Sequence, residues 1–315
     1  MEKTKLLIVH HRHERYRDYL KEFESSLDID SFDVRDPIPF ETHDAEILIG
    51  WKLPPGLFER LPRLRWIAAA AAGVDMILEG IPPERRSDVV VTKATATMPD
   101  FMAEYVITFV FYHMRQLHTV EKQRRQRTWR HVMSDLASRR TLGVIGYGPI
   151  GAKIAELAKS IGMTVYAAKR TPSICPNCDR LFTGSGWREM LPLCDFLVIA
   201  APLTSRTDKM IGARELVSMK RDAVLINISR GRIVDESSLI DALNSRSIAG
   251  AVLDVFNDEP LPEDHPFWDM ENVVITPHCA GPSEEVAICD EFLQNYRRWK
   301  KGKPLARIAD QENGY

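Results

Sequence analysis

Three side chains with complementary chemistry follow apolar stretches in the second half of the chain. They are Arg230, Glu259 and His278. An arginine binds a carboxylate through two parallel hydrogen bonds, and a histidine exchanges a proton near neutral pH. A carboxylate beside that histidine favours its protonated form and fixes its orientation. Together these groups could hold a small carboxylic acid and give a proton to it.

Each of the three residues also has an ordinary structural interpretation. Arg230 could be a surface arginine in a turn, Glu259 a turn residue before Pro260, and His278 a hydrogen-bonded core histidine. All three residues follow expected strands, and this shared position favours a functional role, because the carboxyl ends of parallel strands meet at one edge of a sheet, where ligands bind. If a dinucleotide binds at the same edge, these groups are suited to hydride transfer to a 2-keto acid.

The sequence predicts such a dinucleotide site at Gly146-Tyr-Gly148-Pro149-Ile150-Gly151, between an apolar strand (141–145) and a helix (152–161). The first glycine allows the tight turn, the second lets the backbone approach a pyrophosphate, and the third lets the helix pack closely on the sheet. The N–H groups and the dipole at the helix N-terminus then favour the phosphates. A strand–helix turn without a ligand is the alternative.

Alternating strands and helices surround this motif and predict a doubly wound parallel sheet. After the glycine motif, strands are expected at 164–168, 196–200, 224–228, 251–255 and 273–276. Before it, strands at 6–10, 47–51, 66–70 and 89–92 predict a smaller α/β domain. Helices are expected at 99–114, 117–132, 187–193, 213–219 and 238–245, and a last helix at 284–301 is expected to cover the first domain.

Composition narrows the class of protein. The chain has 315 residues, 44% of them hydrophobic, and a net charge of −2, which disfavours nucleic-acid or membrane binding. The basic run 122–130 is expected to be a solvated or dimer-facing surface rather than a nucleic-acid site. The apolar run 6–9 is too short for a signal peptide, and five cysteines favour a reducing cytoplasm. Cys175 and Cys178 are expected in an ordinary reduced loop, with no metal site.

The motifs in this order resemble the D-2-hydroxyacid dehydrogenase family along nearly the whole chain. They are Ala72-Gly73-Val74-Asp75, Ala103-Glu104, the glycine motif, Cys194-Asp195-Phe196, 201–207, 227–236, 253–256 with Glu259-Pro260, and 277–281. The resemblance implies two Rossmann-like doubly wound parallel-sheet domains with an interdomain cleft. A discontinuous substrate-binding domain would comprise 1–98 and 284–315, and a nucleotide-binding domain 99–283. It also implies a homodimer that pairs through the nucleotide-binding domain.

The resemblance also assigns roles to individual residues. Arg230 would bind the substrate carboxylate and carbonyl, His278 would be the proton donor, and Glu259 its acidic partner. The N–H groups of Gly73 and Val74 would hold the substrate carboxylate. The expected cofactor contacts are Gly146, Gly148, Pro149, Ile150, Gly151, Lys169, Arg170, Thr171, Ala201, Pro202, Thr207, Ile228, Ser229, Arg230, Asp254, His278, Ala280 and Gly281.

One departure from the family pattern predicts the cofactor. NAD-preferring members place an aspartate at the end of the second nucleotide-domain strand, but this chain has Lys169, Arg170 and Thr171 there. Cations and a hydroxyl bind a 2′-phosphate, which an acidic residue would repel. NADP(H) preference is therefore expected, with dual specificity as the alternative. Reduction of a small 2-keto acid such as glyoxylate or hydroxypyruvate follows from the resemblance to the reductases of this family.

Two other functional classes share features with this sequence. L-type lactate or malate dehydrogenases carry the glycine motif near the N-terminus, whereas here it begins after residue 140. A non-enzymatic, nucleotide-sensing scaffold of the C-terminal binding protein type uses the same fold, and catalytic residues alone do not exclude it. Trp51 is expected either near the mouth of the substrate pocket or in the core.

Overall fold

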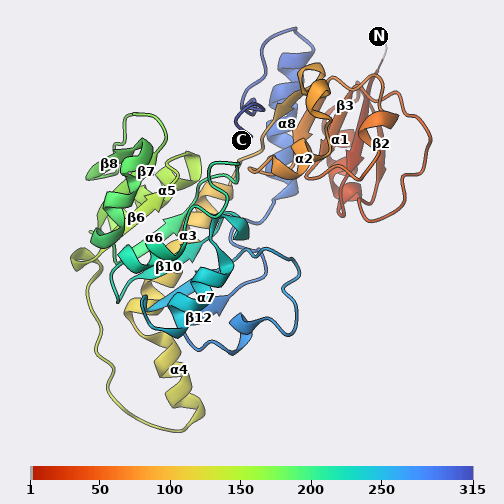
Figure 1. Ribbon diagram of the computed structural model, residues 1–315. Coiled ribbons are helices and arrows are strands. Elements are labelled where there is room, and N and C mark those ends of the chain that lie inside the picture. Colours follow the sequence, from red (N-terminus) through yellow and green to blue (C-terminus); the bar gives the residue numbers. More distant parts are fainter. Residues whose placement is uncertain (1–2, 315) are drawn as a thin grey trace. The chain divides into compact units, whose positions relative to one another are not determined.

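The computed structural model describes residues 3–314, which divide into two compact units, each built on a parallel β-sheet (Figure 1). The first unit comprises Met1–Met98 and Ser283–Tyr315, and the second comprises Pro99–Pro282. In the part of the chain that is described, no helix is long and apolar enough to cross a membrane.

The sheet of the first unit has five strands in the order β2-β1-β3-β4-β5. They are β1 (Thr4–Val9), β2 (Leu27–Phe32), β3 (Ile47–Gly50), β4 (Trp66–Ala69) and β5 (Val90–Thr92). Helices α1 (His13–Phe23) and α8 (Glu285–Trp299) pack over one face. The ring of Trp66 on β4 stacks on Phe292 of α8 at 5.0 Å between centroids, so the C-terminal helix completes the core of this unit.

Strand β2 and helix α1 were not among the predicted elements. The strand reads Leu27-Asp-Ile29-Asp-Ser-Phe32 and lies at the edge of the sheet, and only its first four residues alternate between apolar and polar. Leu27 and Ile29 are buried on one face of the sheet, while Phe32 is buried and Asp30 is exposed on the other face. An edge strand with two aspartates lacks the continuous apolar run that marks the inner strands.

The sheet of the second unit has seven parallel strands in the order β12-β11-β10-β9-β6-β7-β8. They are β6 (Thr141–Ile145), β7 (Thr164–Lys169), β8 (Arg180–Thr183), β9 (Phe196–Ile199), β10 (Val224–Asn227), β11 (Gly250–Leu253) and β12 (Val273–Ile275). The chain direction across the sheet reverses between β6 and β9, which is the switch point of a doubly wound fold.

Helices cover both faces of this sheet. Helices α3 (Met98–Met114) and α5 (Pro149–Ser160) pack on one face, while α6 (Ala213–Ser218), α7 (Glu236–Asn244) and the 3₁₀ helix Gly184–Leu193 pack on the other. The four residues of β9, β10 and β11 are buried throughout, as expected for central parallel strands covered on both sides.

Three local features of this unit differ in detail from the sequence-based expectation. Helix α4 (Leu117–Arg125) ends well before residue 132, because Arg127 adopts a left-handed backbone with a φ of 54°. The helical segment expected at 187–193 is present, but it is a 3₁₀ helix that begins at Gly184 and has Pro192 inside it. The short edge strand β8 was not predicted, since two of its four residues are exposed.

The loop between β7 and β8 also departs from expectation. Cys175 and Cys178 form a disulfide rather than a reduced pair, and their Cα atoms are 5.6 Å apart. A turn in which the N–H of Cys178 donates to the carbonyl of Cys175 brings the two side chains together. That Cα separation lies within the usual range for disulfides, which the sequence spacing alone does not determine.

Candidate active site

The glycine motif lies at the switch point of the second sheet. Gly146 follows β6 and has a φ of 101°, and a Cβ at this position would be 2.5 Å from the backbone nitrogen of Ala201, just beyond β9. A Cβ at Gly151 would overlap the carbonyl oxygen of Gly146. The turn therefore requires glycine for its backbone conformation and for the close approach of helix α5.

The second glycine of the motif faces open space. A Cβ at Gly148 would meet no atom within 4 Å, although the residue lies at the N-cap of α5. Among the described residues, no side chain caps this helix, whose first turn contains Pro149 and Ile150. The free space and the uncapped N–H groups fit a pyrophosphate, because a helix N-terminus attracts anions through its N–H groups and dipole.

The end of β7 lies beside this turn, since the N–H of Gly146 donates to the carbonyl of Ala168 at 2.9 Å. Lys169 is the last residue of the strand, and its Nζ is 3.4 Å from the Oγ of Ser173. Arg170 and Thr171 follow and are exposed. The end of β7 therefore presents cations and hydroxyls.

Two further loops with predicted cofactor contacts meet at the same edge. The Oγ of Ser229, after β10, donates to the carbonyl of Ala201, after β9, and Ile228 is buried between strand and loop. The Oγ1 of Thr207 donates to the carbonyl of Pro202 at 2.6 Å. These bonds fix the backbone of both loops, so the edge of the sheet near the glycine turn is ordered.

Arg230 is held at the end of β10 by its own turn. The buried Asn227 donates from Nδ2 to the carbonyl of Arg230 at 2.9 Å and accepts from the N–H of Ser229 at 3.1 Å. A Cβ at Gly231 would overlap the backbone of Phe256, which precedes Glu259. The glycine therefore lets the loop that carries Arg230 approach the loop that carries Glu259.

Glu259 binds His278 directly. The Oε2 of Glu259 is 2.8 Å from the Nδ1 of His278, and its Oε1 accepts the N–H of Phe256 at 3.0 Å. Burial opposes ionisation of Glu259, but the hydrogen bonds from His278 and Phe256 and the charges of His278 and Arg230 outweigh it and lower its pKa. The three side chains predicted for chemistry therefore come together at one edge of the sheet.

The turn that carries His278 is built around Asp254, which is 1% exposed. The Oδ1 of Asp254 accepts the N–H of Cys279 at 2.8 Å and the hydroxyl of Thr276, and Oδ2 accepts the N–H of Ala280 at 2.9 Å. The backbone of His278 has a φ of 49°. A left-handed backbone at a residue other than glycine is uncommon and typical of functional sites.

Helix α3 also contacts this turn, which no sequence pattern indicated. The phenol oxygen of Tyr105 is 2.6 Å from the Oγ1 of Thr276. The side chain of Met102 lies against Gly281, where a Cβ would be 3.0 Å from its Cγ. Tyr105 and Thr276 are separated by 171 positions in the chain, so neither could be linked to His278 from local periodicity.

Gly73 and Val74, the predicted substrate-binding residues, belong to the first unit. They follow β4, whose carboxyl end is bonded to the neighbouring strand β3. Val74 is buried, and its carbonyl accepts the N–H groups of Ile77 and Leu78 as helix α2 (Asp75–Glu79) begins. In the same unit, the Nζ of Lys52 lies 4.9 Å from the centroid of the Trp51 ring.

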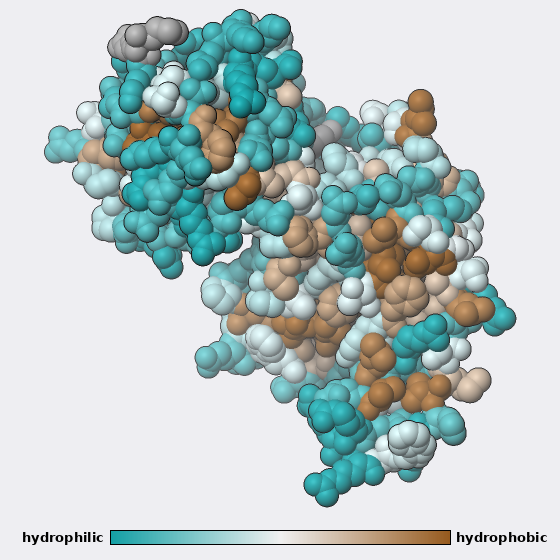
Figure 2. All heavy atoms as spheres, turned by 180° about the vertical axis from the view of Figure 1, so that it is seen from behind, coloured by the Kyte–Doolittle hydropathy of each residue, from teal (hydrophilic) through white to brown (hydrophobic). Residues whose placement is uncertain are grey.

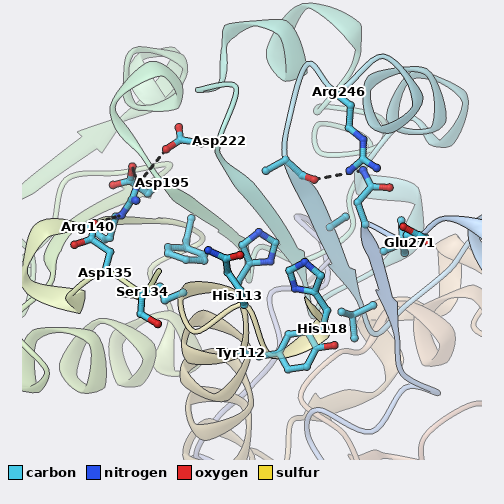
Figure 3. A pocket seen from close by; sticks show the side chains of 18 of the residues that line it. Tyr112, His113, His118, Ser134, Asp135, Arg140, Asp195, Asp222, Arg246 and Glu271 are labelled. Carbon is cyan, nitrogen blue, oxygen red and sulfur yellow. Dashed lines mark hydrogen bonds and ion pairs between the residues drawn. The ribbon is translucent and has the colours of Figure 1, made fainter. Parts of the chain in front are cut away.

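A cavity of about 610 Å³ lies at the opposite, amino-terminal edge of the second sheet (Figure 3). Its lining includes Tyr112 and His113 at the end of α3, and an ion cluster in which Arg140 contacts Asp195 and Asp222. No predicted catalytic or cofactor residue of the described chain lines this cavity. It is therefore a separate feature from the glycine turn and the His278 loop.

Known proteins resemble both the sequence and the fold. The family model described as "D-isomer specific 2-hydroxyacid dehydrogenase, NAD binding domain" matches residues 107–280. A glyoxylate reductase of Korarchaeum cryptofilum is 33% identical over 266 residues, which cover 81% of this chain and 79% of that protein.

Solved structures match the whole chain. A D-isomer-specific 2-hydroxyacid dehydrogenase from Xanthobacter autotrophicus Py2, in complex with NADPH and MES, has a TM-score of 0.91 and 31% identity, with 100% of both chains covered. An NADPH-dependent glyoxylate/hydroxypyruvate reductase from Sinorhizobium meliloti, in complex with NADP and sulfate, has a TM-score of 0.89 and 29% identity, with 99% of this chain and 100% of that chain covered.

Proposed function

The chain belongs to the D-isomer-specific 2-hydroxyacid dehydrogenases, a family of oxidoreductases, and we propose that it is an NADP(H)-preferring reductase of small 2-keto acids. Glyoxylate and hydroxypyruvate are the substrates we assign first, because relatives of similar sequence carry these names. The observation that carries the proposal is the 2.8 Å contact between His278 and Glu259 at the edge of the sheet that holds the glycine turn.

In this proposal the side chains of the second unit bind and protonate the substrate. Arg230 pairs with the carboxylate of the keto acid through its guanidinium. A bound nicotinamide cofactor supplies the hydride for the carbonyl carbon. Protonated His278 gives its proton to the carbonyl oxygen, and Glu259 keeps the imidazole ring oriented and stabilises its charge. The product is the D-hydroxy acid.

The residues of the glycine turn and the end of β7 are assigned to NADPH. Gly146, Gly148 and Gly151 give the pyrophosphate access to the N–H groups of α5. Lys169 and Arg170 are assigned to the 2′-phosphate. Cofactor preference is supported by these side chains and by similar proteins whose structures contain NADPH or NADP.

We also propose that two chains pair through the second unit. Figure 1 draws α4 and the loop after it standing away from the sheet of that unit, and Figure 2 draws apolar side chains gathered near the base of this arm. Trp129 and Met133 on the arm are 94% and 83% exposed. Such exposed apolar side chains favour a protein interface. Replacing both by serine should convert a dimer to a monomer in light scattering; a wild-type chain that is itself monomeric contradicts pairing.

The proposed activity is tested by following the nicotinamide absorbance with NADPH and NADH in parallel against a panel of 2-keto acids. We expect NADPH to be oxidised with glyoxylate or hydroxypyruvate, NADH to be oxidised more weakly, and the D-hydroxy acid to accumulate. Tight NADPH binding without turnover of any keto acid would contradict the reductase assignment and favour the nucleotide-sensing scaffold.

A further inference from the structure

A chain of hydrogen bonds connects helix α3 with the turn that carries His278. It passes from the phenol of Tyr105 to the hydroxyl of Thr276 and then to the carboxylate of Asp254. We propose that Tyr105 and Thr276 are positioning residues, which hold Asp254 and through it the His278 turn in the geometry required for proton transfer. The inference about proton transfer rests on the proposed function.

The direction of these hydrogen bonds follows from donor capacity. An ionised carboxylate only accepts, so the single hydroxyl proton of Thr276 is donated to Asp254. The Oγ1 of Thr276 is then left as an acceptor, and Tyr105 must donate to it across 2.6 Å. Burial raises the pKa of Tyr105, which keeps its phenol protonated and able to donate. Thr276 is therefore the link between a fixed helix and the carboxylate.

The carboxylate of Asp254 also binds the backbone of the two residues that follow His278. It accepts the N–H groups of Cys279 and Ala280 at 2.8 and 2.9 Å. The main-chain carbonyl of the same residue accepts the N–H of His278 at 2.9 Å. One residue thus holds three successive N–H groups of the turn.

These three hydrogen bonds matter because the backbone conformation of His278 is intrinsically unfavourable. Its φ of 49° costs free energy at a residue with a Cβ, so surrounding bonds must impose it. The ring of His278 is half exposed and has the carboxylate of Glu259 as its side-chain partner in the second unit. If the turn relaxes, the ring is free to move with it, and the imidazole proton leaves the position from which transfer is efficient.

Four substitutions test the proposal. Thr276→Val removes the hydroxyl at nearly constant shape, whereas Thr276→Ser keeps the hydroxyl and serves as the conservative rescue. Tyr105→Phe removes only the hydrogen bond between Tyr105 and Thr276, which is the one farthest from His278. Tyr112→Phe is the matched control, because Tyr112 lies on the same helix two turns later and lines the cavity at the other edge of the sheet (Figure 3).

We expect Thr276→Val to lower kcat by about tenfold or more while KM and the Kd of NADPH stay within about twofold. The substitution disturbs the position of the His278 ring and leaves the binding of substrate and NADPH intact. Tyr105→Phe should lower kcat by about fivefold, the size of one hydrogen bond. Thr276→Ser and Tyr112→Phe should match the wild type. Equal kcat values for Thr276→Val and Thr276→Ser contradict the proposal, as does an unchanged kcat in Tyr105→Phe.

A measurement independent of turnover separates this inference from the proposed function. In protein with ¹⁵N-labelled histidine, the imidazole signal of His278 is assigned by its absence in His278→Gln. We expect the signal to move or broaden in Thr276→Val and to stay in place in Thr276→Ser and Tyr112→Phe. An unmoved signal in Thr276→Val overturns the inference, even where kcat falls. If His278→Gln retains full turnover, the proposed proton donor is wrong, while the signal still tests whether Thr276 holds the turn.

Discussion

The Nδ1 of His278 lies 2.8 Å from the Oε2 of Glu259, and this contact fixes how the histidine can act. The pKa of Glu259 is lowered, so its carboxylate is ionised near neutral pH and only accepts hydrogen bonds. Nδ1 therefore carries a proton and donates it to Glu259. In the proposed reduction, Nε2 is the nitrogen left to exchange a proton with the substrate, and it can donate only when the ring is protonated.

Removing His278 should abolish efficient reduction. We expect His278→Ala to lower kcat for glyoxylate or hydroxypyruvate by at least about 10²-fold, because the substitution removes the proposed proton donor. The Kd of NADPH, measured by fluorescence, should stay close to that of the wild type, which excludes a loss of fold. Turnover near the wild-type value would refute the role of His278 as proton donor.

Removing the charge of Glu259 should lower the rate of the proposed reduction. The lowered pKa of Glu259 keeps its carboxylate ionised near neutral pH, where it accepts the hydrogen bond of Nδ1 and orients the ring of His278. In Glu259→Gln, kcat at about pH 7 should therefore fall by about tenfold or more, because a neutral amide replaces the charged partner of the ring. Glu263→Gln, which alters an exposed glutamate of the same loop, serves as the control, and equal kcat values in both variants would contradict the pairing.

The end of β7 should determine the choice between the two cofactors. Lys169→Ala combined with Arg170→Asp should raise the KM for NADPH by at least about tenfold, because a carboxylate repels the 2′-phosphate. The KM for NADH, which lacks this phosphate, should change by less than about threefold. Arg221→Asp, before β10 on the opposite edge of the sheet, controls for the replacement of an arginine by an aspartate. Equal losses for both cofactors would contradict the assignment.

Two glycines of the same turn should respond oppositely to alanine. Gly146→Ala should lower the free energy of unfolding by about 3 kcal/mol, because its φ of 101° and the backbone of Ala201 exclude a Cβ. Gly148→Ala should change the free energy of unfolding by less than about 1 kcal/mol, since a Cβ there would meet no atom within 4 Å and the backbone is extended. The same substitution should weaken NADPH binding at least about tenfold by occupying the space for the pyrophosphate. Urea unfolding and NADPH titration of both variants test these two predictions. Unimpaired NADPH binding by Gly148→Ala would contradict the assignment of this space to the pyrophosphate.

The elements that could be predicted are those whose local sequence pattern is compatible with only one kind of structure. The apolar stretch 141–145 followed by three spaced glycines specifies a strand, a tight turn and a helix, and the structure has these elements. The central strands β9, β10 and β11 were predicted for the same reason, because a strand buried on both faces is a continuous apolar run.

The unpredicted part depends on tertiary contacts. Strand β2 is stable only as the edge of a sheet formed by distant segments, and α4 is shorter than its composition suggests because Arg127 turns the chain. The convergence of Arg230, Glu259 and His278 at one edge of the sheet could be predicted from their positions after strands. The contact of Tyr105 with Thr276 could not, since it joins a helix to a loop 171 positions later.

His113 should make the stability of the second unit depend on pH. Burial and the neighbouring His118 lower the pKa of His113 to about 4, from an ordinary value of 6.5. Its folded pKa is depressed, so below pH 6.5 the unfolded chain takes up a proton that the folded chain does not. Stability is therefore lost as the pH falls from 6.5 toward 4, by at most about 3 kcal/mol at roughly 1.4 kcal/mol per pKa unit.

Replacing this histidine should remove part of that dependence. In His113→Phe, which keeps a ring against Phe196, the fall in the free energy of unfolding between about pH 7.5 and 5 should be smaller than in the wild type. Some dependence should remain, because burial also lowers the pKa of His10 in the first unit to about 3. Urea unfolding across this range measures the slope, with His131→Phe at an exposed position as the control. Identical slopes for His113→Phe and the wild type would show that His113 takes up its proton equally in the folded and unfolded chain.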